Sequence, residues 1–336
     1  MTAQTPPRVA IVGAGLMGYW HTKASRRAGG RVVAIVDRNP TRAEALAAGV
    51  AGSCAVRDLD EVVDRVDVVH ICTPTATHVA LTTFALEARR HVLVEKPLAT
   101  SAPAAAALLD LATRQGVLLC PVHQFLFQDG VESAIARLPA IGPLRHISFA
   151  TCSAGADAAG QLEADDVALE ILPHPLSLLA RLLPATNNIE WSVRHPAPGE
   201  IRALAQAGDV TCSLLISMSG RPTTNALELI GARGTTFVDL FHGFAVTHPG
   251  GVSRLRKAAR PFMSAAATAG AAGLNLAKRS WRTEPAYPGL RRLLQLFYRA
   301  AAGDGACPIP PAETFAVARE SDRLRQLVSA ATATSV

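Results

Sequence analysis

The sequence predicts an α/β protein, with an N-terminal domain on a doubly wound parallel sheet and a C-terminal α+β domain with a large, mostly antiparallel open sheet. The length of 336 residues suits two domains. Apolar residues make up 49% and charged residues 18%, which is typical of a folded globular chain. Short β-branched runs alternate with helical stretches over residues 1–122, and this alternation stops near residue 123. We therefore assign residues 1–122 to the first domain and residues 123–336 to the second.

Hydrophobic periodicity and turn residues locate the elements of each domain. The first domain is expected to contain strands at 8–12, 31–36, 67–72, 91–94 and 117–121, and helices at 16–28, 41–48, 59–66, 77–89 and 102–115. The second is expected to contain strands at 144–152, 189–194, 200–205, 210–218, 225–230 and 235–240, and helices at 125–138, 169–183, 290–302 and 312–330. Its strands follow one another without crossover helices, which indicates antiparallel pairing.

The positive charge of the chain is concentrated in one segment. The net charge is +6, yet no acidic residue lies between Asp239 and Glu284. The basic residues of that interval are Arg254, Arg256, Lys257, Arg260, Lys278, Arg279 and Arg282. Without these seven the net charge is −1, which argues against a general nucleic-acid-binding surface.

The cysteines and the start of the chain bear on its location. No Cys-x-x-Cys pair occurs among the six cysteines, and three of them lie in apolar strand-like runs, as buried free thiols do. Residues 1–8 lack the charged, apolar and small-residue zones of a signal peptide. We therefore expect a cytoplasmic protein without a zinc site.

A glycine-rich turn, Gly13-Ala-Gly15-Leu-Met-Gly18, directly follows the first expected strand and opens a helix. In that context the first glycine permits a tight turn, the second lets a pyrophosphate approach the backbone, and the third lets the helix pack on the strand. The anion then lies at a helix N-terminus. The pattern predicts a Rossmann domain that binds a dinucleotide. We assign to the cofactor site Gly13, Gly15, Leu16, Met17 and Gly18.

The end of the second strand bears on the choice of cofactor. Asp37 follows Gly18 by 19 residues, at the position where a carboxylate bonds the adenosine ribose hydroxyls. This carboxylate would repel the 2′-phosphate of NADP, which favours NAD. Arg38 could instead stack on adenine or neutralise that phosphate, so NADP stays the alternative, and a solvated Arg38 is equally compatible with the sequence.

Polar residues also follow the strand at 67–72, at the sheet edge where open α/β sheets bind ligands. Thr77 is a candidate helix N-cap, and the sequence leaves open whether the threonines here cap a helix or bind the cofactor. His78 lies one residue into the helix, where a histidine is more often structural than catalytic. We include in the cofactor site Thr73, Pro74, Thr75 and His78.

Glu95 and Lys96 lie at the carboxyl end of the strand at 91–94. A buried strand end is a costly place for charge unless the charge is used. Lysine is also scarce, with four lysines against 29 arginines, so an exposed position would more often hold arginine. We infer that both residues belong to the functional site; a surface ion pair in a loop is the alternative.

These motifs resemble the glucose-fructose oxidoreductase, inositol dehydrogenase and rhizopine catabolism family, Gfo/Idh/MocA. The resemblance rests on the residues at 13–18, 36–38, 72–78 and 95–99, and the domain order extends it along essentially the whole chain. It implies that Lys96 contacts both the nicotinamide ribose and the reacting hydroxyl, and that Pro97 is cis. It also implies a substrate on the open sheet face of the second domain, in the strands after Leu144, and a homo-oligomer, dimer or tetramer.

The family's second signature, Asp-x-Gly-x-His-x-x-Asp, is partly retained at 170–177 as Glu170 and His174. The resemblance implies that His174 takes the hydroxyl proton as hydride leaves the same carbon, while Glu170 orients it. The alternative is a structural histidine between two prolines. Gln124 stands where the family has asparagine or histidine, and we include it in the cofactor site, although Leu126 replaces the nearby arginine. The sequence shows no cluster of metal ligands.

Residues 250–288 form a basic, alanine-rich insertion. Residues 262–277 are uncharged, too short and too weakly apolar for a membrane-spanning helix. The sequence favours a helical lid or subunit-contact segment with solvated arginines. The alternative is a basic amphipathic patch that binds an anionic membrane or a diphosphate-bearing substrate such as a nucleotide sugar or lipid-linked sugar.

The resemblance implies an NAD(P)-dependent dehydrogenase or reductase that acts on CH–OH groups. Hydride would pass between the nicotinamide and a secondary alcohol or ketone of a sugar, cyclitol or (nucleotide-)sugar derivative, a small polyhydroxy substrate. One alternative is a redox-neutral epimerase or eliminase that retains its NAD. Another is a non-catalytic NAD-binding protein, for which the altered motif around His174 argues and against which the intact Glu95 and Lys96 argue.

Overall fold

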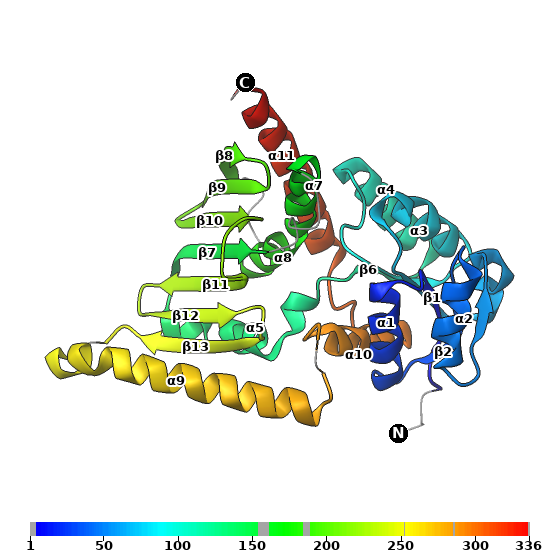
Figure 1. The fold of residues 1–336 in the computed structure, drawn as a ribbon, viewed down its shortest axis with the longest axis horizontal. Helices are drawn as coiled ribbons and strands as arrows, with labels where there is room; N and C mark the ends of the chain where they lie inside the picture. The colour runs from blue at the N-terminus through cyan, green and yellow to red at the C-terminus, as the bar shows by residue number, and fades with distance from the viewer. Residues whose placement is uncertain (1–4, 154–160, 184–188, 252, 285, 335–336) are drawn as a thin grey trace. The chain divides into compact units, whose positions relative to one another are not determined.

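The computed structural model describes residues 5–153, 161–183, 189–251, 253–284 and 286–334. The chain folds into two compact units (Figure 1). The first is made of Met1–Gln124 and Gly289–Asp322, and the second of Phe125–Pro288 and Arg323–Val336. The side chains of Arg254 and Arg256, which belong to the basic insertion, lie outside the described part of the chain.

The first unit is built on a six-stranded parallel sheet with the strand order β3-β2-β1-β4-β5-β6. This is the doubly wound Rossmann order, and it confirms the expected fold. Its strands are β1 (Arg8–Val12), β2 (Arg31–Val36), β3 (Cys54–Val56), β4 (Val68–Ile71), β5 (His91–Val94) and β6 (Leu119–Pro121). Its N-terminal helices are α1 (Leu16–Arg27), α2 (Pro40–Ala48), α3 (His78–Glu87) and α4 (Ala102–Gln115), with 3₁₀ turns η1 (Leu59–Glu61), η2 (Val63–Arg65) and η3 (Thr75–Thr77).

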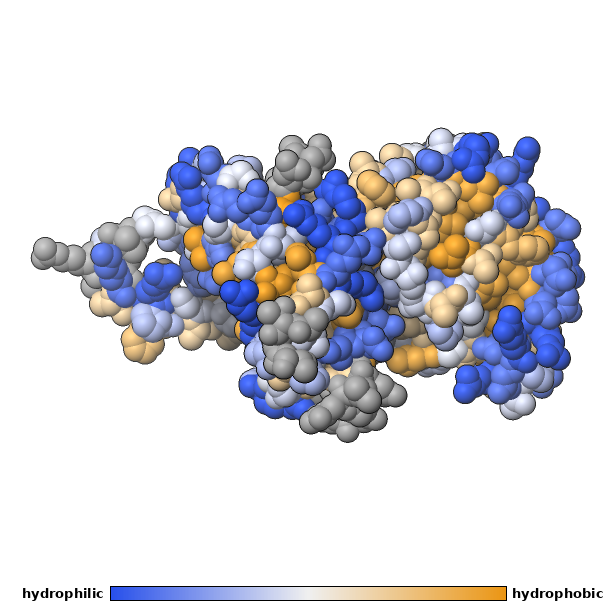
Figure 2. All heavy atoms as spheres, turned by 90° about the horizontal axis from the view of Figure 1, so that it is seen from above, coloured by the Kyte–Doolittle hydropathy of each residue, from blue (hydrophilic) through white to orange (hydrophobic). Residues whose placement is uncertain are grey.

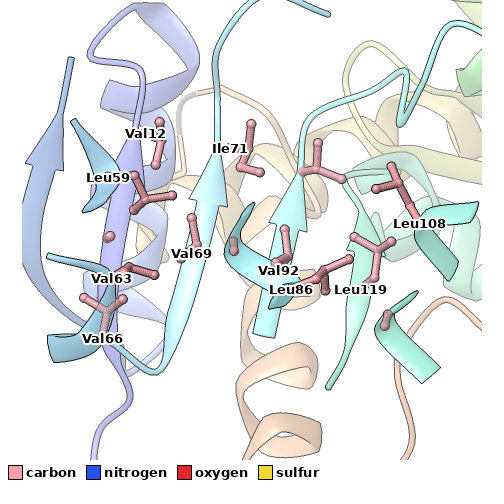
Figure 3. Close-up of a cluster of buried hydrophobic side chains, with 14 of the residues drawn as sticks. Val12, Leu59, Val63, Val66, Val69, Ile71, Leu86, Val92, Leu108 and Leu119 are labelled. Carbon is pink, nitrogen blue, oxygen red and sulfur yellow. The ribbon is translucent and has the colours of Figure 1, made fainter. Parts of the chain in front are cut away.

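Apolar side chains from both strands and helices fill the space on one side of this sheet (Figure 3). Val69 and Ile71 of β4 are fully buried, and Leu86 of α3 and Leu108 of α4 pack against the same cluster. Strands with helices on both faces carry continuous apolar runs, and β4 accordingly has four buried residues in succession. Burying each leucine or valine stabilises the fold by roughly 1.5–3 kcal/mol, so this cluster fixes the strand ends that follow it.

The outer surface over α3 and α4 is also largely apolar (Figure 2). Both helices are rich in alanine and leucine, and their inner faces bury Ala85, Leu86, Leu108 and Leu109.

No helix in the described part of the chain is both long enough and apolar enough to cross a membrane.

Helix α10 (Leu290–Ala301) returns to the first unit and packs against α1. Its buried residues recur at the spacing of one helix face: Leu290, Leu293, Leu294, Phe297 and Tyr298. The sequence predicts this helix but not its contact with α1, because the apolar pattern of one helix face does not indicate which surface that face packs against. Helix α11 (Pro311–Thr334) closes the chain.

The second unit is built on a seven-stranded sheet with the order β13-β12-β11-β7-β10-β9-β8. All neighbours pair antiparallel except β7 and β10, which are parallel, so the mostly antiparallel sheet is confirmed. Its strands are β7 (Leu144–Cys152), β8 (Glu190–Ala197), β9 (Glu200–Ala207), β10 (Val210–Ser217), β11 (Thr224–Gly231), β12 (Gly234–Asp239) and β13 (Phe244–Pro249). Its helical segments are η4 (Gln124–Phe127), α5 (Asp129–Ala136), α6 (Leu138–Ile141), α7 (Gln161–Ile171), α8 (Pro173–Leu182) and α9 (Arg254–Trp281).

Some expected elements differ from the observed ones. The expected helix at 59–66 is two 3₁₀ turns, because Val62 between them has a φ of −133° and a ψ of −9°, which is not a helical conformation. The expected helix at 169–183 is divided at Leu172, where Pro173 follows without a backbone N–H. The edge strands β3 and β13 were not predicted: β3 has only three residues, and β13 carries His248 and Pro249 at its end.

The carboxylate of Asp165 connects helix α7 to the β8–β9 hairpin. Asp165 accepts a hydrogen bond from the Gly199 N–H (2.6 Å) and pairs with His195 Nε2 (2.8 Å). Gly199 has a φ of +75°, which favours glycine at this turn. These contacts fix the direction of the helix whose last turn carries Glu170.

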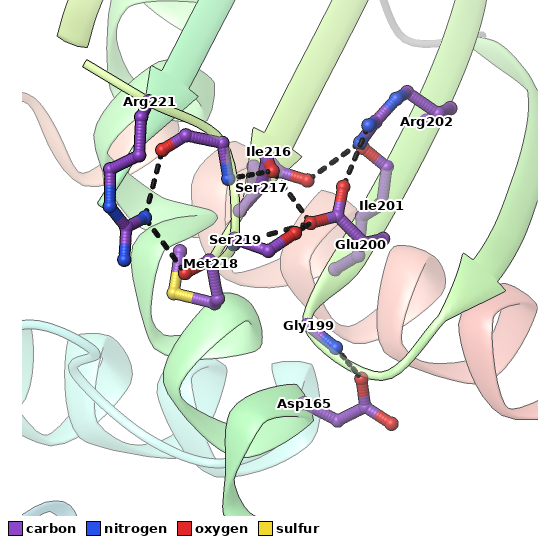
Figure 4. A network of polar contacts seen from close by, with 11 residues as sticks. Asp165, Gly199, Glu200, Ile201, Arg202, Ile216, Ser217, Met218, Ser219 and Arg221 are labelled. Carbon is purple, nitrogen blue, oxygen red and sulfur yellow. Dashed lines mark hydrogen bonds and ion pairs between the residues drawn. The ribbon is translucent and has the colours of Figure 1, made fainter. Parts of the chain in front are cut away.

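A second carboxylate, Glu200, is buried where β9 begins (Figure 4). Its Oε1 accepts hydrogen bonds from Ser217 Oγ (2.6 Å) and from both N–H and Oγ of Ser219, and its Oε2 accepts one from Arg202 (2.7 Å). Burial raises the pKa of a carboxyl group, but the hydrogen bonds from Ser217, Ser219 and Arg202 together outweigh burial and lower the pKa of Glu200 to about 2. The network thereby ties the start of β9 to the end of β10.

Replacing this carboxylate by an amide (E200Q) is expected to lower the free energy of unfolding by about 2–3 kcal/mol at neutral pH. The pKa of Glu200 is lowered on folding, so its contribution is fully present above the ordinary value of 4.5 and is lost as the pH falls toward 2. Urea unfolding over this range measures the difference, which should shrink below pH 4.5. The exposed Glu190 supplies the control E190Q. A difference between wild type and E200Q that does not change with pH would contradict this account.

Candidate functional site

The glycine-rich loop between β1 and α1 is closed by backbone contacts. Gly13 has a φ of +97°, and a Cβ there would lie 2.8 Å from the Cys72 carbonyl oxygen. A Cβ on Gly18 would lie 1.8 Å from the Gly13 carbonyl oxygen, because α1 packs directly on the loop. Both glycines are therefore required by the protein itself.

Gly15 differs from these two glycines. It is exposed, its φ is −81° and ψ −161°, and a Cβ there would meet no atom of the protein within 4 Å. Neither backbone conformation nor packing requires glycine, which leaves close approach by a ligand as the reason. Gly15 is also the N-cap of α1, no side chain caps this helix end, and its first turn has no acidic residue. Free N–H groups of this kind bind anions, so the loop fits the pyrophosphate of a dinucleotide.

Leu16 and Met17 begin α1 beside this opening, and Leu16 is 67% exposed. Asp37 directly follows the neighbouring β2. Its Oδ2 accepts a hydrogen bond from the Ala14 N–H (2.7 Å) and its Oδ1 accepts one from the Asn39 N–H (2.8 Å). Each carboxylate oxygen keeps a lone pair for a ribose hydroxyl. Arg38 is exposed beside it. The structure thus brings the glycine-rich loop into contact with Asp37, as the spacing in the sequence predicted.

A buried histidine joins the loops after β4 and β5. His78 is 1% exposed; its Nε2 lies 2.8 Å from the Thr73 carbonyl oxygen and its Nδ1 lies 2.7 Å from the Pro97 carbonyl oxygen. Carbonyls only accept, so both bonds form together only when both ring nitrogens carry a proton. His78 therefore positions these two loops, and its relation to the cofactor is through them.

The threonines before it form their own turn. Thr77 donates to Thr73 Oγ1 (2.7 Å) and contacts the Pro74 carbonyl oxygen (2.8 Å), and its side chain makes no capping bond to α3. The cap that the sequence offered as an alternative is thus not formed by Thr77. Thr75 is half-buried in the same turn.

Glu95 and Lys96 follow β5 at the same edge of the sheet. Glu95 is 7% exposed, and its Oε2 accepts a hydrogen bond from the Lys96 N–H (3.2 Å). The Lys96–Pro97 peptide is cis, as the family resemblance implied. Lys96 is half-buried, whereas an ion pair on an open surface would leave it exposed.

The buried Glu95 begins a chain of polar side chains that the sequence analysis missed. Its Oε1 lies 3.0 Å from His21 Nε2, and His21 Nδ1 lies 3.0 Å from His70 Nδ1. His70 Nε2 lies 3.0 Å from the Tyr298 hydroxyl, which donates to Ser25 Oγ (2.8 Å). The chain joins α1, β4, β5 and α10. A histidine inside the otherwise apolar strand β4 was the one signal of it in the sequence.

The interior sets the protonation of two members. Burial, and then the neighbouring His21, lower the pKa of His70 well below its ordinary range, so His70 is neutral at neutral pH. Burial raises the pKa of Tyr298, which keeps its proton. A neutral imidazole has one donor and one acceptor. Because the Tyr298 hydroxyl donates to Ser25, it accepts from the His70 Nε2–H, and His70 Nδ1 accepts from the His21 Nδ1–H.

Gln124 lies where the first unit ends, with 7% of its surface exposed. Its Oε1 is buried and accepts no hydrogen bond from any described residue. An acceptor buried without a donor costs about 1–3 kcal/mol. A donor on a bound ligand would satisfy it, which fits the assignment of Gln124 to the cofactor site.

Glu170 and His174 belong to the second unit. His174 lies in the first turn of α8, is half-buried, and stacks on Phe125 with ring centroids 4.3 Å apart and an angle of 18° between the planes. Glu170 lies in the last turn of α7 and is exposed. Because Lys96 belongs to the first unit, a joint site of Lys96 and His174 stays a prediction.

The contrast between Gly15 and Gly18 is testable. The G15A variant should keep the unfolding free energy of the wild type but bind NADH about tenfold more weakly or worse, because the methyl group occupies the space of the pyrophosphate. The G18A variant should lose both stability and NADH binding. Thermal unfolding and NADH fluorescence titration measure the two quantities. Unchanged NADH binding by folded G15A would contradict the assignment of this loop.

Removal of the Tyr298 hydroxyl tests the buried chain. Y298F leaves His70 Nε2 and Ser25 Oγ without this partner, and we expect a loss of about 1–3 kcal/mol in the free energy of unfolding by urea. The control is Y19F, since Tyr19 is 40% exposed. Equal stability of Y298F and Y19F would show that the chain contributes nothing.

Comparison with known proteins finds a family model and several relatives that are similar in sequence. Residues 7–123 match a family model described as oxidoreductase family, NAD-binding Rossmann fold (GFO_IDH_MocA). An inositol 2-dehydrogenase of Mycolicibacterium gilvum (strain PYR-GCK) is 36% identical over 141 residues, 41% of this chain and 40% of that protein. A dTDP-3,4-didehydro-2,6-dideoxy-alpha-D-glucose 3-reductase of Streptomyces violaceoruber is 31% identical over 221 residues, 61% of this chain and 64% of that protein. The first of these matches thus spans about two fifths of the relative's length.

Similarity of structure extends further than similarity of sequence. A levoglucosan dehydrogenase, solved in complex with NADH and levoglucosan, superposes with a TM-score of 0.80 over 97% of this chain and 98% of that chain, at 16% identity. At this identity the likeness shows the two-domain fold alone. The family model covers residues 7–123, which contain the glycine-rich loop, Asp37 and the strand ends described above. Residues 7–123 are therefore similar to the NAD-binding Rossmann fold of the Gfo/Idh/MocA oxidoreductase family.

Proposed function

We propose that the protein is an NAD(P)-dependent oxidoreductase acting on a secondary alcohol or ketone of a sugar, cyclitol or nucleotide-sugar derivative. The observation that carries the proposal is the half-buried Lys96, held at the carboxyl end of β5 by a buried Glu95 on the same sheet edge as the Gly15 opening. The substrate class rests on the names of the relatives, which are dehydrogenases and reductases of such compounds.

The residues divide the work as follows. Gly15 and the N-terminus of α1 hold the pyrophosphate, Asp37 holds the adenosine ribose, and Gln124 accepts a hydrogen bond from the nicotinamide half. Asp37 favours NAD, with NADP as the alternative. The nicotinamide, when bound, supplies a hydride acceptor or donor.

Lys96 holds the substrate oxygen and lowers the free energy of the negative charge that develops on it during oxidation. His174 takes the hydroxyl proton, or returns it during reduction, and Glu170 orients the imidazole. Stacking on Phe125 fixes the plane of this ring.

The domains and the setting follow from the same proposal. Residues 1–122, together with Gln124, bind the cofactor, and residues 123–336 bind the substrate and form a homo-oligomer through the sheet. A cytoplasmic location accords with six cysteines that are all free thiols.

Variants of Lys96 test the catalytic assignment. Purified wild type, K96M and the control K278M are titrated with NADH and NADPH by fluorescence and assayed with a cyclitol, a free sugar and nucleotide sugars. We expect all three to bind NADH, and K96M alone to lose at least about a hundredfold in kcat/KM, since one lost transition-state contact of this kind costs ~3 kcal/mol. K96R should stay impaired, because a guanidinium does not place its charge as an ammonium does.

Each contrary result has a definite meaning. Binding of neither nucleotide would overturn the cofactor site. NADH binding without turnover in the wild type, with cofactor retained through purification, would favour the redox-neutral alternative. Turnover by K96M equal to that of K278M would remove Lys96 from the reaction.

A further inference from the structure

Helix α9 has its large apolar residues on the outside. It runs along β13 (Figure 1), and none of its described residues from 257 to 281 is fully buried. Between residues 257 and 281 the large apolar residues have exposed fractions of 57% to 91%; they are Phe262, Met263, Leu274, Leu276 and Trp281. A surface helix ordinarily turns such residues to the core. In α9 the arrangement is reversed.

The inward face of α9 is made of small and polar residues. Ser264, Ala271, Ala272 and Asn275 are half-buried, while their large neighbours are exposed. Asn275 Nδ2 and Arg279 donate to the His242 carbonyl oxygen, each at 2.9 Å. These bonds fix the rotation of α9, so the outward position of the apolar residues is set by the fold.

The outward residues are ordered along the helix. Met263, Leu274 and Trp281 are separated by 11 and 7 residues, which at about 100° per residue places them within roughly 20° of one line. Arg260 and Lys278 form a second line, about 60° around the helix from the first. We call these five residues the α9 outer face. An apolar row flanked by cations is typical of helices that lie in a membrane interface.

The cations of this region are available to a ligand. Lys257, Arg260 and Lys278 have no carboxylate partner among the described residues. Lys257 and Arg260, with His248, line a hollow of about 400 Å³ formed by the turns at Gly231–Gly234 and Gly250. The residues that line this hollow include two cations and no acidic residue.

We propose that α9 binds the surface of an anionic lipid bilayer. The apolar row enters the boundary between headgroups and acyl chains, Arg260 and Lys278 pair with lipid phosphates, and the hollow at Lys257 takes one headgroup. This binding does not depend on the proposed oxidoreductase activity.

The alternative occupant, a second copy of this chain on the same face, is disfavoured by charge. Both ends of α9 are basic, with Lys257 and Arg260 at one end and Lys278 at the other. Two copies paired through this face place cation against cation, whether the helices run parallel or antiparallel. Anionic phosphates relieve this repulsion, and each basic residue near an anionic membrane adds to the binding.

Co-sedimentation of the full chain with vesicles tests the proposal. We expect binding to phosphatidylcholine vesicles that contain phosphatidylglycerol, little binding to phosphatidylcholine alone, and release by salt. The emission of Trp281, 91% exposed in the free protein, should shift to the blue on binding, and W281F should abolish the shift. Competition by glycerol phosphate in solution distinguishes the two possible ligands, because it should not release the protein from vesicles if the ligand is a bilayer.

Two variants and a matched control define the outcome. M263S/W281S and K257E/R260E should each weaken vesicle binding by about tenfold or more. The control R114E/R137E changes charge equally at exposed arginines elsewhere and should bind more tightly than K257E/R260E by a similar factor. Circular dichroism and NADH binding verify that each variant is folded.

The proposal fails on any of three results. The first is equal sedimentation with neutral and anionic vesicles. The second is release of the protein from anionic vesicles by glycerol phosphate to the same extent as by lowering the fraction of anionic lipid. The third is a concentration-dependent dimer that M263S/W281S dissociates, together with no binding to vesicles. The last result would assign the α9 outer face to a contact between copies of this chain.

Discussion

The first unit depends on one constraint, a carboxylate that is buried at the end of a parallel strand. A buried Glu95 is tolerated only with hydrogen-bond partners, since an unpaired carboxylate in the interior costs several kcal/mol. His21 supplies one partner, and His70 and Tyr298 in turn fix His21. The helix that opens the phosphate site therefore also supports the strand end that carries Lys96. A short path of hydrogen-bonded polar groups thus connects these two parts of the first unit.

The sequence predicted most of the first unit because its signals are local. The bounds of β1, β2, β5 and α4 are those expected, as apolar runs, turn residues and caps lie within the elements that they define. The return of α10 and the chain to Tyr298 are not local. Tyr298 and His70 are separated by 228 residues, and no periodicity in either segment indicates the other. The strands β3 and β13 were not predicted for a different reason, since short edge strands have little apolar pattern to detect.

The candidate site shows the same limit at the level of single residues. The motif assigned a different role to each of its three glycines, and the contacts distinguish them in the same way: the protein itself requires Gly13 and Gly18, whereas no protein atom within 4 Å requires Gly15. The sequence left His78 open between structural and functional roles, and its contacts with two carbonyls give it a positioning role. The buried Oε1 of Gln124 without a donor is visible only in three dimensions.

Helix α9 illustrates how structure changes the weight of a composition argument. From composition alone, solvated arginines on a lid were favoured over a lipid-binding patch. A lid or a solvated helix gains nothing from exposed Phe262, Met263 and Trp281, because each side chain forgoes roughly 1.5–3 kcal/mol that burial would provide. The bonds of Asn275 and Arg279 hold the helix in that orientation, so the cost is built into the fold. A surface that covers the apolar row recovers this free energy, and the uncompensated cations beside the row determine that such a surface is anionic.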